Sequence, residues 1–253
     1  MAGNKIYIGT SGWNYNHWKG RFYPEKLSQK KWLEYYQNFF STVEVNMTFY
    51  RFPKREIFSQ WKKDLKKNFL FSLKANRIIT HIKKLKDVEN LVKNFIDISS
   101  ELEAHLGPIL FQLPPSWNLN IQRFKEFLVS LKHSKASSNL KFVIELRDER
   151  WKNKEIYEIL RNENICLCFS DHPECAVDGP VTSDIVYIRK HGPGSLYSSC
   201  YSLKEIYELS EEIKKFVKDG KIVYVYFNND ANAWAIKNVL ELKNNLKEFF
   251  SNR

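Results

Sequence analysis

Eight short apolar runs recur along the whole chain, and each one ends in a polar or charged cluster. The runs span residues 6–8, 43–45, 69–73, 109–113, 142–146, 165–169, 185–188 and 222–227. Eight repeats of a strand followed by a helix, in 253 residues, predict a TIM-like (β/α)8 barrel of the α/β class. The carboxyl ends of all eight strands meet on one face of that fold. The polar clusters are therefore expected to converge on a single site.

Most segments between the runs carry the apolar stripes of helices. Stripes cover residues 28–40, 54–66, 88–102, 120–131, 203–217 and 231–249, with Asp87 as a candidate N-cap and a capping box at Ser202 and Glu205. The interval between Asp171 and Ile185 differs, because it holds two prolines and a glycine and no stripe. We therefore expect the outer helix after the sixth strand to be missing or replaced by a loop. No linker divides the chain, so residues 1–253 are predicted to form a single TIM-barrel domain.

The chain is strongly basic, with 40 Lys and Arg against 29 Asp and Glu and a net charge of +11. A charge of this sign favours anionic partners, either a small anionic substrate or nucleic acid. A second interpretation is that the lysines only decorate solvated faces of the helices. Charge alone leaves these interpretations open.

Composition also limits the class of protein. Hydrophobic residues make up 43% of the chain, enough to form a core, which excludes a disordered protein. Of four cysteines, Cys166 and Cys168 alternate inside an apolar run, where Cys behaves as a small hydrophobe, and no disulfide pattern is present. No signal peptide and no run of membrane-spanning length is visible, so we expect a cytoplasmic protein without a membrane partner.

Glu44 and Glu145 are the most informative single positions, because each lies inside an apolar run, where a charge is costly to bury without a partner. Two carboxylates in different environments can serve as general acid and general base. His191 shares a strand face with Arg189 and is the best histidine for proton transfer. The candidate catalytic residues are Glu44, Glu145, His191 and Asp171.

The cations near the strand ends allow two interpretations of those carboxylates. In the first, Arg147 and Arg189 hold a carboxylate or phosphate of the substrate in bidentate fashion, and Lys74 acts beside them as a point charge. In the second, the same three cations form a salt-bridge layer with the carboxylates that closes the top of the barrel without chemistry. The sequence does not separate the two.

No cofactor is predicted from the motifs. The chain has no Walker loop, no GxGxxG after a strand and no GxSxG elbow. Loop histidines together with Glu44, Glu145, Asp171 and Asp230 leave a divalent metal site open as an alternative, but no HxH or HExxH pair makes it specific.

Seven segments resemble, in order and spacing, the motifs of the domain of unknown function 72 family, also called YecE-like. They read IYIGTSGWNYNHWKGRFYP, TVEVNMTFYRFP, FLFSLKANRIITH, LGPILFQLPPSW, FVIELRDERW, VYIRKHGP and VYVYFNND. The resemblance implies a TIM-like barrel with a polar pocket at its carboxyl face. The substrate-binding residues that it implies are Thr10, Ser11, Trp13, Asn46, Tyr50, Lys74, His81, Gln112, Arg147, Trp151, Arg189, Tyr201, Asn228, Asn229 and Asp230.

Three functions fit these observations. The first is an enzyme, a hydrolase or isomerase, that uses acid/base chemistry on an anionic, phosphorylated or sugar-containing substrate. The second is a nucleic-acid-binding or metal-dependent nuclease-like protein, suggested by the charge and the loop aromatics. The third is a non-catalytic protein that binds a small ligand in the same pocket. The sequence does not indicate an oligomeric state.

Overall fold

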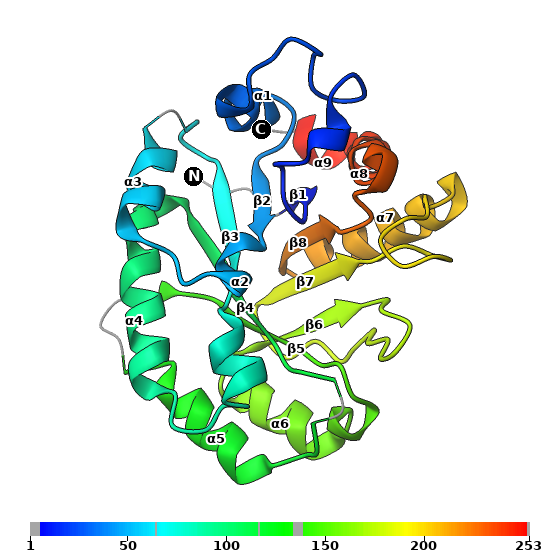
Figure 1. The fold of residues 1–253 in the computed structure, drawn as a ribbon. Coiled ribbons are helices and arrows are strands. Elements are labelled where there is room, and N and C mark those ends of the chain that lie inside the picture. Colours follow the sequence, from blue (N-terminus) through cyan, green and yellow to red (C-terminus); the bar gives the residue numbers. More distant parts are fainter. Residues whose placement is uncertain (1–5, 64, 116, 134–138, 252–253) are drawn as a thin grey trace.

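A computed structural model describes residues 6–63, 65–115, 117–133 and 139–251. Its eight strands are all parallel and lie in the order β1-β8-β7-β6-β5-β4-β3-β2 (Figure 1). They are β1 (Ile6–Thr10), β2 (Thr42–Val45), β3 (Leu70–Lys74), β4 (Leu106–Gln112), β5 (Phe142–Glu145), β6 (Cys166–Ser170), β7 (Ile185–Lys190) and β8 (Ile222–Phe227). The ends of β1 and β2 meet through one bridge, where the Gly12 amide donates to the Glu44 carbonyl at 2.7 Å. The barrel is therefore nearly closed, and the predicted TIM-like fold is confirmed.

Helices surround the barrel (Figure 1). They are α1 (Trp32–Tyr36), α2 (Met47–Tyr50), α3 (Arg55–Lys62), α4 (Glu89–Ser99), α5 (Ile121–Ser130), α6 (Lys154–Asn162), α7 (Leu203–Lys218), α8 (Trp234–Asn245) and α9 (Lys247–Ser251). The capping box of α7 forms as predicted, and Asn120 caps α5 by accepting a hydrogen bond from the Arg123 amide at 3.0 Å. The predicted cap at Asp87 is wrong. Asp87 sits in a tight turn with a φ of 49°, and Val88 is the N-cap of α4.

The segment between β6 and β7, all of it described, contains no helix. It runs as a loop along β6 instead, pairing Val177 with Ser170 in an antiparallel bridge. The Thr182 hydroxyl then accepts from the Leu167 amide at 2.8 Å and donates to the Ile165 carbonyl at 2.7 Å. These bonds fasten the loop where an outer helix would otherwise pack, so the predicted loss of that helix is confirmed.

The interior of the barrel is layered. Aromatic and cysteine side chains, among them Tyr187, Tyr226 and Cys168, fill its middle and are buried. Above them, toward the carboxyl ends of the strands, lies a layer of buried charged groups that includes Glu44, Glu145 and Arg189. Alternation along β7 produces this order, because Tyr187 and Arg189 are two residues apart and point into the same interior.

Among the residues described, no helix combines the length and the apolar character needed to cross a bilayer.

Candidate functional site

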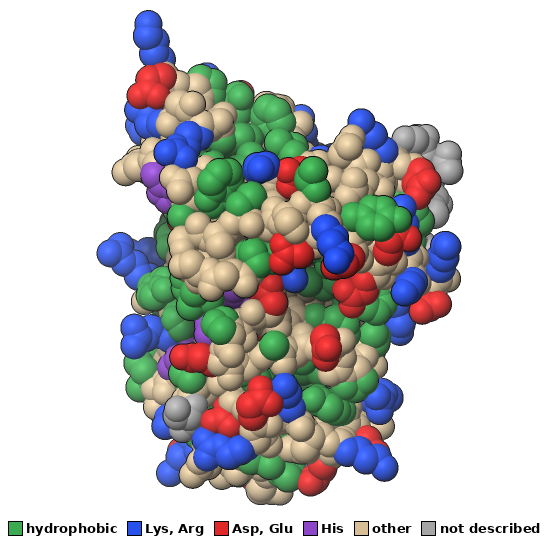
Figure 2. Space-filling view, turned by 90° about the vertical axis from the view of Figure 1, so that its right-hand side faces the viewer, with side chains coloured by type: hydrophobic (Ala, Val, Ile, Leu, Met, Phe, Trp, Pro, Cys, Tyr) green, Lys and Arg blue, Asp and Glu red, His purple; other side chains and the backbone are tan. Residues whose placement is uncertain are grey.

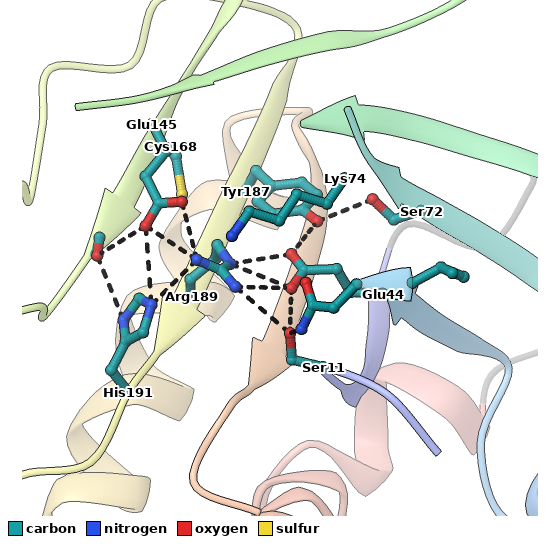
Figure 3. A network of polar contacts seen from close by, with 12 residues as sticks. Ser11, Glu44, Ser72, Lys74, Glu145, Cys168, Tyr187, Arg189 and His191 are labelled. Carbon is teal, nitrogen blue, oxygen red and sulfur yellow. Dashed lines mark hydrogen bonds and ion pairs between the residues drawn. The ribbon is translucent and has the colours of Figure 1, made fainter. Parts of the chain in front are cut away.

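Arg189 is the centre of the polar layer. It extends from β7 across the barrel and is 1% exposed. Its Nη1 lies 2.8 Å from Glu145 Oε2, its Nη2 lies 2.8 Å from Glu44 Oε1, and its Nε lies 3.0 Å from Glu44 Oε2 (Figure 3). One guanidinium therefore joins β2, β5 and β7 through two charge-assisted, forked contacts.

Both carboxylates of this layer stay ionised. Burial alone would raise the pKa of Glu44, but the charge of Arg189 and hydrogen bonds from Arg189, Ser11 and Tyr187 hold that pKa below its ordinary value. The Tyr187 hydroxyl donates to Glu44 Oε2 at 2.7 Å, and the Ser11 hydroxyl donates to Oε1. Burial of Glu145 is outweighed in the same way by Arg147 and Arg189, which hold its pKa well below the usual range.

His191 is a neutral acceptor in this network. Its Nε2 lies 3.1 Å from Arg147 Nη2 and 3.0 Å from Arg189 Nη1. A guanidinium can only donate, so Nε2 must accept and the ring proton resides on Nδ1. Nδ1 faces Asp171 Oδ1 and Ser170 Oγ, each at 3.4 Å. Burial lowers the pKa of His191 to about 4, which keeps the ring uncharged at neutral pH.

Asp171 fastens the loop after β7. Its Oδ1 accepts from the His191 amide at 2.7 Å, and its Oδ2 lies 2.9 Å from Lys190 Nζ and accepts from the Tyr201 hydroxyl. The Tyr201 oxygen in turn accepts from the Gly192 amide at 2.6 Å. These contacts fix the backbone that carries His191.

A pocket of about 720 Å³ opens above the polar layer at the carboxyl ends of the strands. It is lined by Gly12, Trp13, Asn14, Tyr15, Val45, Asn46, Met47, Tyr50, Ile57, Trp61, Lys74, Arg147, Arg189, Tyr197, Asn228 and Asp230. Cations and amides thus share the pocket with aromatic and aliphatic side chains. Such a lining suits a small ligand with a charged end and an apolar or ring-shaped end.

Lys74 differs from the other cations of the pocket. Its Nζ lies 4.2 Å from the centre of the Phe49 ring, and no hydrogen bond or ion pair to it is found among the residues described. Burial, and then the charge of Arg189, lower the pKa of Lys74 to about 7. This amine therefore changes protonation state near neutral pH.

Two further polar side chains of the pocket each have one buried atom without a hydrogen-bond partner among the described residues. Arg147 Nη2 lies 2.7 Å from Glu145 Oε1, whereas Arg147 Nε is buried with no partner in the described part of the chain. Asn46 Nδ2 donates to the Ser11 hydroxyl at 2.9 Å, and Asn46 Oδ1 is likewise buried and unpartnered within that part. Burial of unpaired polar atoms is costly, and a ligand that paired with them would offset that cost.

Asp230 adds a carboxylate to the pocket wall. Burial raises its pKa above the ordinary value, and its Oδ2 lies 3.4 Å from His17 Nε2. The Asp230 carbonyl accepts from the indole of Trp18 at 2.9 Å, which anchors the loop after β8. Lys74 and Asp230 are thus two titratable groups of one pocket whose pKa values are shifted toward each other.

Eight of the predicted substrate-binding residues line this pocket: Trp13, Asn46, Tyr50, Lys74, Arg147, Arg189, Asn228 and Asp230. Ser11, Glu44, Glu145 and His191 belong to the polar layer beneath it.

Other predicted site residues lie elsewhere. Thr10 shares a hydrogen bond of 2.8 Å with the Tyr36 hydroxyl on α1. The Trp151 indole donates to the Trp117 carbonyl at 2.8 Å, and Asn229 donates to Asn238 at 3.0 Å. His81 contacts Thr80 and the ring of Phe49, Tyr201 binds Asp171, and Gln112 ends β4 in register with Glu145. Asp171, His81, Gln112, Trp151, Tyr201, Thr10 and Asn229 are absent from the pocket lining.

The sequence did not assign several lining residues to the site. Ile57 and Trp61 carry the apolar stripe of α3, which indicated only a core-facing helix. Trp61 in fact packs edge-on against Trp13, with ring centres 5.1 Å apart, and forms part of the pocket wall. Tyr15 also lines the wall, and its hydroxyl donates to the Ser11 carbonyl at 2.6 Å. Their pocket role depends on how α3 and the loop after β1 pack over the barrel, which periodicity does not reveal.

Within the described ranges, no group of three or more His, Cys, Asp or Glu side chains is placed to hold one metal ion. The carboxylates considered as ligands are bound elsewhere, since Glu44 and Glu145 pair with arginines and Asp171 with Lys190. The residues present therefore do not fit the divalent site left open by the sequence.

Residues 7–252 match the family model described as protein of unknown function DUF72. The chain belongs to this family. A solved DUF72 family protein of Thermotoga maritima MSB8 is 31% identical and has a TM-score of 0.84, with 96% of this chain and 99% of that chain covered. The UPF0759 protein YunF of Bacillus subtilis is 23% identical over 92% of each chain. A DUF72 family protein of Enterococcus faecalis V583, 22% identical with a TM-score of 0.81 over 96% of this chain and 95% of that one, shares the fold.

Proposed function

We propose that this DUF72 protein is an enzyme that acts on a small anionic substrate by acid/base chemistry in the pocket at the carboxyl face of the barrel. One observation carries the proposal. Lys74 lines a pocket of about 720 Å³ with no carboxylate bonded to it in the described part of the chain, and its pKa is lowered to about 7. A proton-transfer group is most effective when its pKa lies near the working pH.

The roles of the charged residues follow from their contacts. Lys74 exchanges the proton, and Asp230 is the second titratable group that faces the substrate. The sequence predicted this role for Glu44 and Glu145. We assign these two carboxylates to positioning instead, because each is buried, ionised and bonded to arginine. They hold Arg147 and Arg189 in place so that the cations need not reorganise when the substrate binds.

The lining also limits the substrate. Arg147, Lys74 and Asn46 favour a carboxylate or phosphate group at the pocket floor. Trp13, Trp61 and the neighbouring aliphatic side chains favour a ring or an apolar chain at the wall. A hydrolase or isomerase acting on a phosphorylated, carboxylated or sugar-containing compound suits this arrangement.

Proton uptake tests the proposal. An anion beside Lys74 favours the charged amine, so anion binding should raise the pKa of Lys74. Sulfate itself has no titratable proton near neutrality. When it binds, the protein should take up part of one proton on Lys74 at about pH 8 and almost none at about pH 6, where Lys74 is already charged. Calorimetry in buffers of different ionisation enthalpy measures this uptake.

Lys74→Arg is the matched control, since it keeps the charge and removes the titration. It should bind sulfate without proton uptake, and it should lose turnover of any substrate found in a screen of sugar phosphates and carboxylates. Sulfate binding to the unchanged protein with no proton uptake would contradict the role of Lys74. Saturable ligand binding with no product from any compound would instead favour the non-catalytic binding protein.

Binding of nucleic acid remains a prediction that rests on the net charge of +11. On the face shown in Figure 2, basic and acidic side chains are intermixed and do not form one basic stripe. If phosphates of a duplex are contacted, affinity for DNA must fall steeply with salt, roughly 10³-fold or more between 50 and 200 mM.

A further inference from the structure

The amine of Lys74 is placed to react as well as to exchange a proton. In Figure 3 its side chain extends toward the guanidinium of Arg189, among groups already bonded to one another. Glu44 is bonded to Arg189, and Glu145 is bonded to Arg189 and Arg147. Neither carboxylate forms an ion pair with the Lys74 amine. A lysine that is desolvated and close to other cations has a larger share of its neutral amine near neutral pH than an exposed lysine has, and the neutral amine is the nucleophilic form.

Groups that recognise a carboxylate lie in the same pocket. Arg147 uses Nη2 to bind Glu145 and His191, while its buried Nε has no partner among the described residues. A guanidinium binds a carboxylate most strongly through two parallel N–H donors. Arg147, which lines the same pocket as Lys74, therefore has one donor left for an anionic oxygen.

Another part of the lining is apolar. Trp61, Ile57 and Met47 face the pocket from α3 and α2. Trp61 packs in one aromatic cluster with Trp13 and with Phe71, whose ring centre lies 5.1 Å from that of Trp61. A ligand with its carboxylate at Arg147 would place an apolar substituent against this wall.

From this geometry we propose that Lys74 forms an imine with the carbonyl carbon of a 2-oxo acid that carries an apolar side chain. In a 2-oxo acid the carbonyl is bonded directly to the carboxylate, so one small molecule supplies both the electrophile and the anion. The proposal deepens the proposed function and rests on the same anion-binding pocket.

Formation of the imine needs no oxidant or reductant, and water is the only product released. The amine nitrogen attacks the carbonyl carbon, so a C–N bond forms while the C=O π bond breaks and the oxygen takes a proton from the nitrogen. The resulting hydroxyl then leaves as water with the second proton of the amine, and the C=N bond forms. Asp230, whose pKa is raised by burial, lines the pocket and can relay these protons.

Reductive trapping tests the imine. The full-length protein is incubated with phenylpyruvate and sodium cyanoborohydride, and the adduct is measured by intact-mass spectrometry and located by peptide mapping. We expect one adduct per chain, at Lys74, formed about 100-fold faster than at surface lysines, because those hold their amines protonated near neutral pH. Lys74→Arg should abolish it, and Lys204→Arg, a change of an exposed lysine on α7, should leave it unchanged.

A second variant tests the carboxylate contact. Arg147→Lys keeps the positive charge beside Lys74 but loses the Nε donor, so it should slow trapping of phenylpyruvate roughly tenfold. Benzaldehyde has no carboxylate, and its trapping at Lys74 should change by less than about twofold. An equal effect on both probes would overturn the assignment of the carboxylate to Arg147.

Adducts spread evenly over the lysines, or an adduct that persists in Lys74→Arg, would contradict the proposed imine at Lys74.

The experiments distinguish failure of the imine proposal from failure of the proposed function. Sulfate binding with proton uptake but no adduct at Lys74 overturns the imine and leaves the acid/base enzyme standing, whereas the absence of both overturns both. Melting temperatures of all variants verify folding, and Lys74→Met replaces Lys74→Arg if the arginine variant does not fold.

Discussion

The lowered pKa of Lys74 carries a cost in stability. Its amine is enclosed beside Arg189 and Arg147, and burial together with these charges disfavours the protonated form. An unfolded lysine has no such neighbours and keeps a pKa near its ordinary value. Below the folded pKa of about 7, therefore, folding confines a charge that water would solvate better.

Lys74→Met should stabilise the protein, and the gain should depend on pH. Between about pH 7 and 10.5 the unfolded state binds the proton that the folded state lacks, so the cost of Lys74 is full below about pH 7 and disappears toward pH 10.5. We expect a gain of about 2 kcal/mol near pH 6.5 that falls by half or more near pH 9.5, after allowance for the part of the side chain that faces pocket solvent. Urea unfolding of both proteins at the two pH values measures it. A gain that grows with pH would contradict the lowered pKa.

At the scale of an element, β7 and the residue after it supply the centre of the polar layer. Tyr187 and Arg189 alternate along the strand, and His191 follows directly after its end on the same side. One strand therefore places a hydroxyl, a guanidinium and a neutral imidazole next to Glu44 and Glu145, which come from β2 and β5. The register of the parallel sheet pairs Ser170 of β6 with Arg189 of β7, and the Ser170 hydroxyl lies 3.5 Å from Glu145 on β5.

Arg189→Met should destabilise the protein strongly, because it removes the arginine paired with buried Glu44 and one of the two arginines paired with buried Glu145. Removing one partner of a buried ion pair typically costs about 3–5 kcal/mol. Chemical denaturation measures this loss of unfolding free energy. Lys204→Met breaks an exposed pair with Glu208 on α7 and should cost less than about 1 kcal/mol. Similar losses in the two variants would show that the polar layer contributes no more than a surface ion pair.

For the whole molecule, histidines with lowered pKa values set the response to acid. His191 and His81 both have a pKa lowered to about 4, in each case mainly by burial. The carboxyl groups of Glu44, Glu145 and Asp171 have lowered pKa values, and they contribute stability that is lost only at more acid pH. Loss of stability should therefore begin with the histidines.

The unfolding free energy should fall as the pH drops from about 6.5 to 4, because the unfolded histidines take up protons that the folded ones exclude. His191 alone should account for about 2–3 kcal/mol over that range. His191→Asn keeps a neutral acceptor and should flatten this part of the curve, whereas His133→Gln, at an exposed position, should not alter it. Urea midpoints across the pH range measure the effect, and an unchanged slope in His191→Asn would contradict it.

The periodicity of apolar residues and the polar residues at strand ends were sufficient to predict the architecture from the sequence alone. The eight apolar runs became the eight strands, and the two prolines and the glycine between Asp171 and Ile185 correctly predicted the missing helix. Local signals suffice here, because a strand or a helix end is specified by residues close to one another in the chain. The same rule correctly predicted the Ser202 capping box but not the cap at Asp87, where the turn from the preceding segment fixes the backbone.

Only the tertiary structure decided which of the charged groups are bonded to one another. The sequence left two interpretations open for these residues, chemistry or a salt-bridge layer: Glu44, Glu145, Lys74, Arg147 and Arg189. Arg189 extends across the barrel and pairs with both Glu44 and Glu145. Lys74 has no bonded counter-ion in the part of the chain described. These pairings join residues 44 and 145 positions apart, and they depend on distances of a few ångströms that no pattern in the sequence contains.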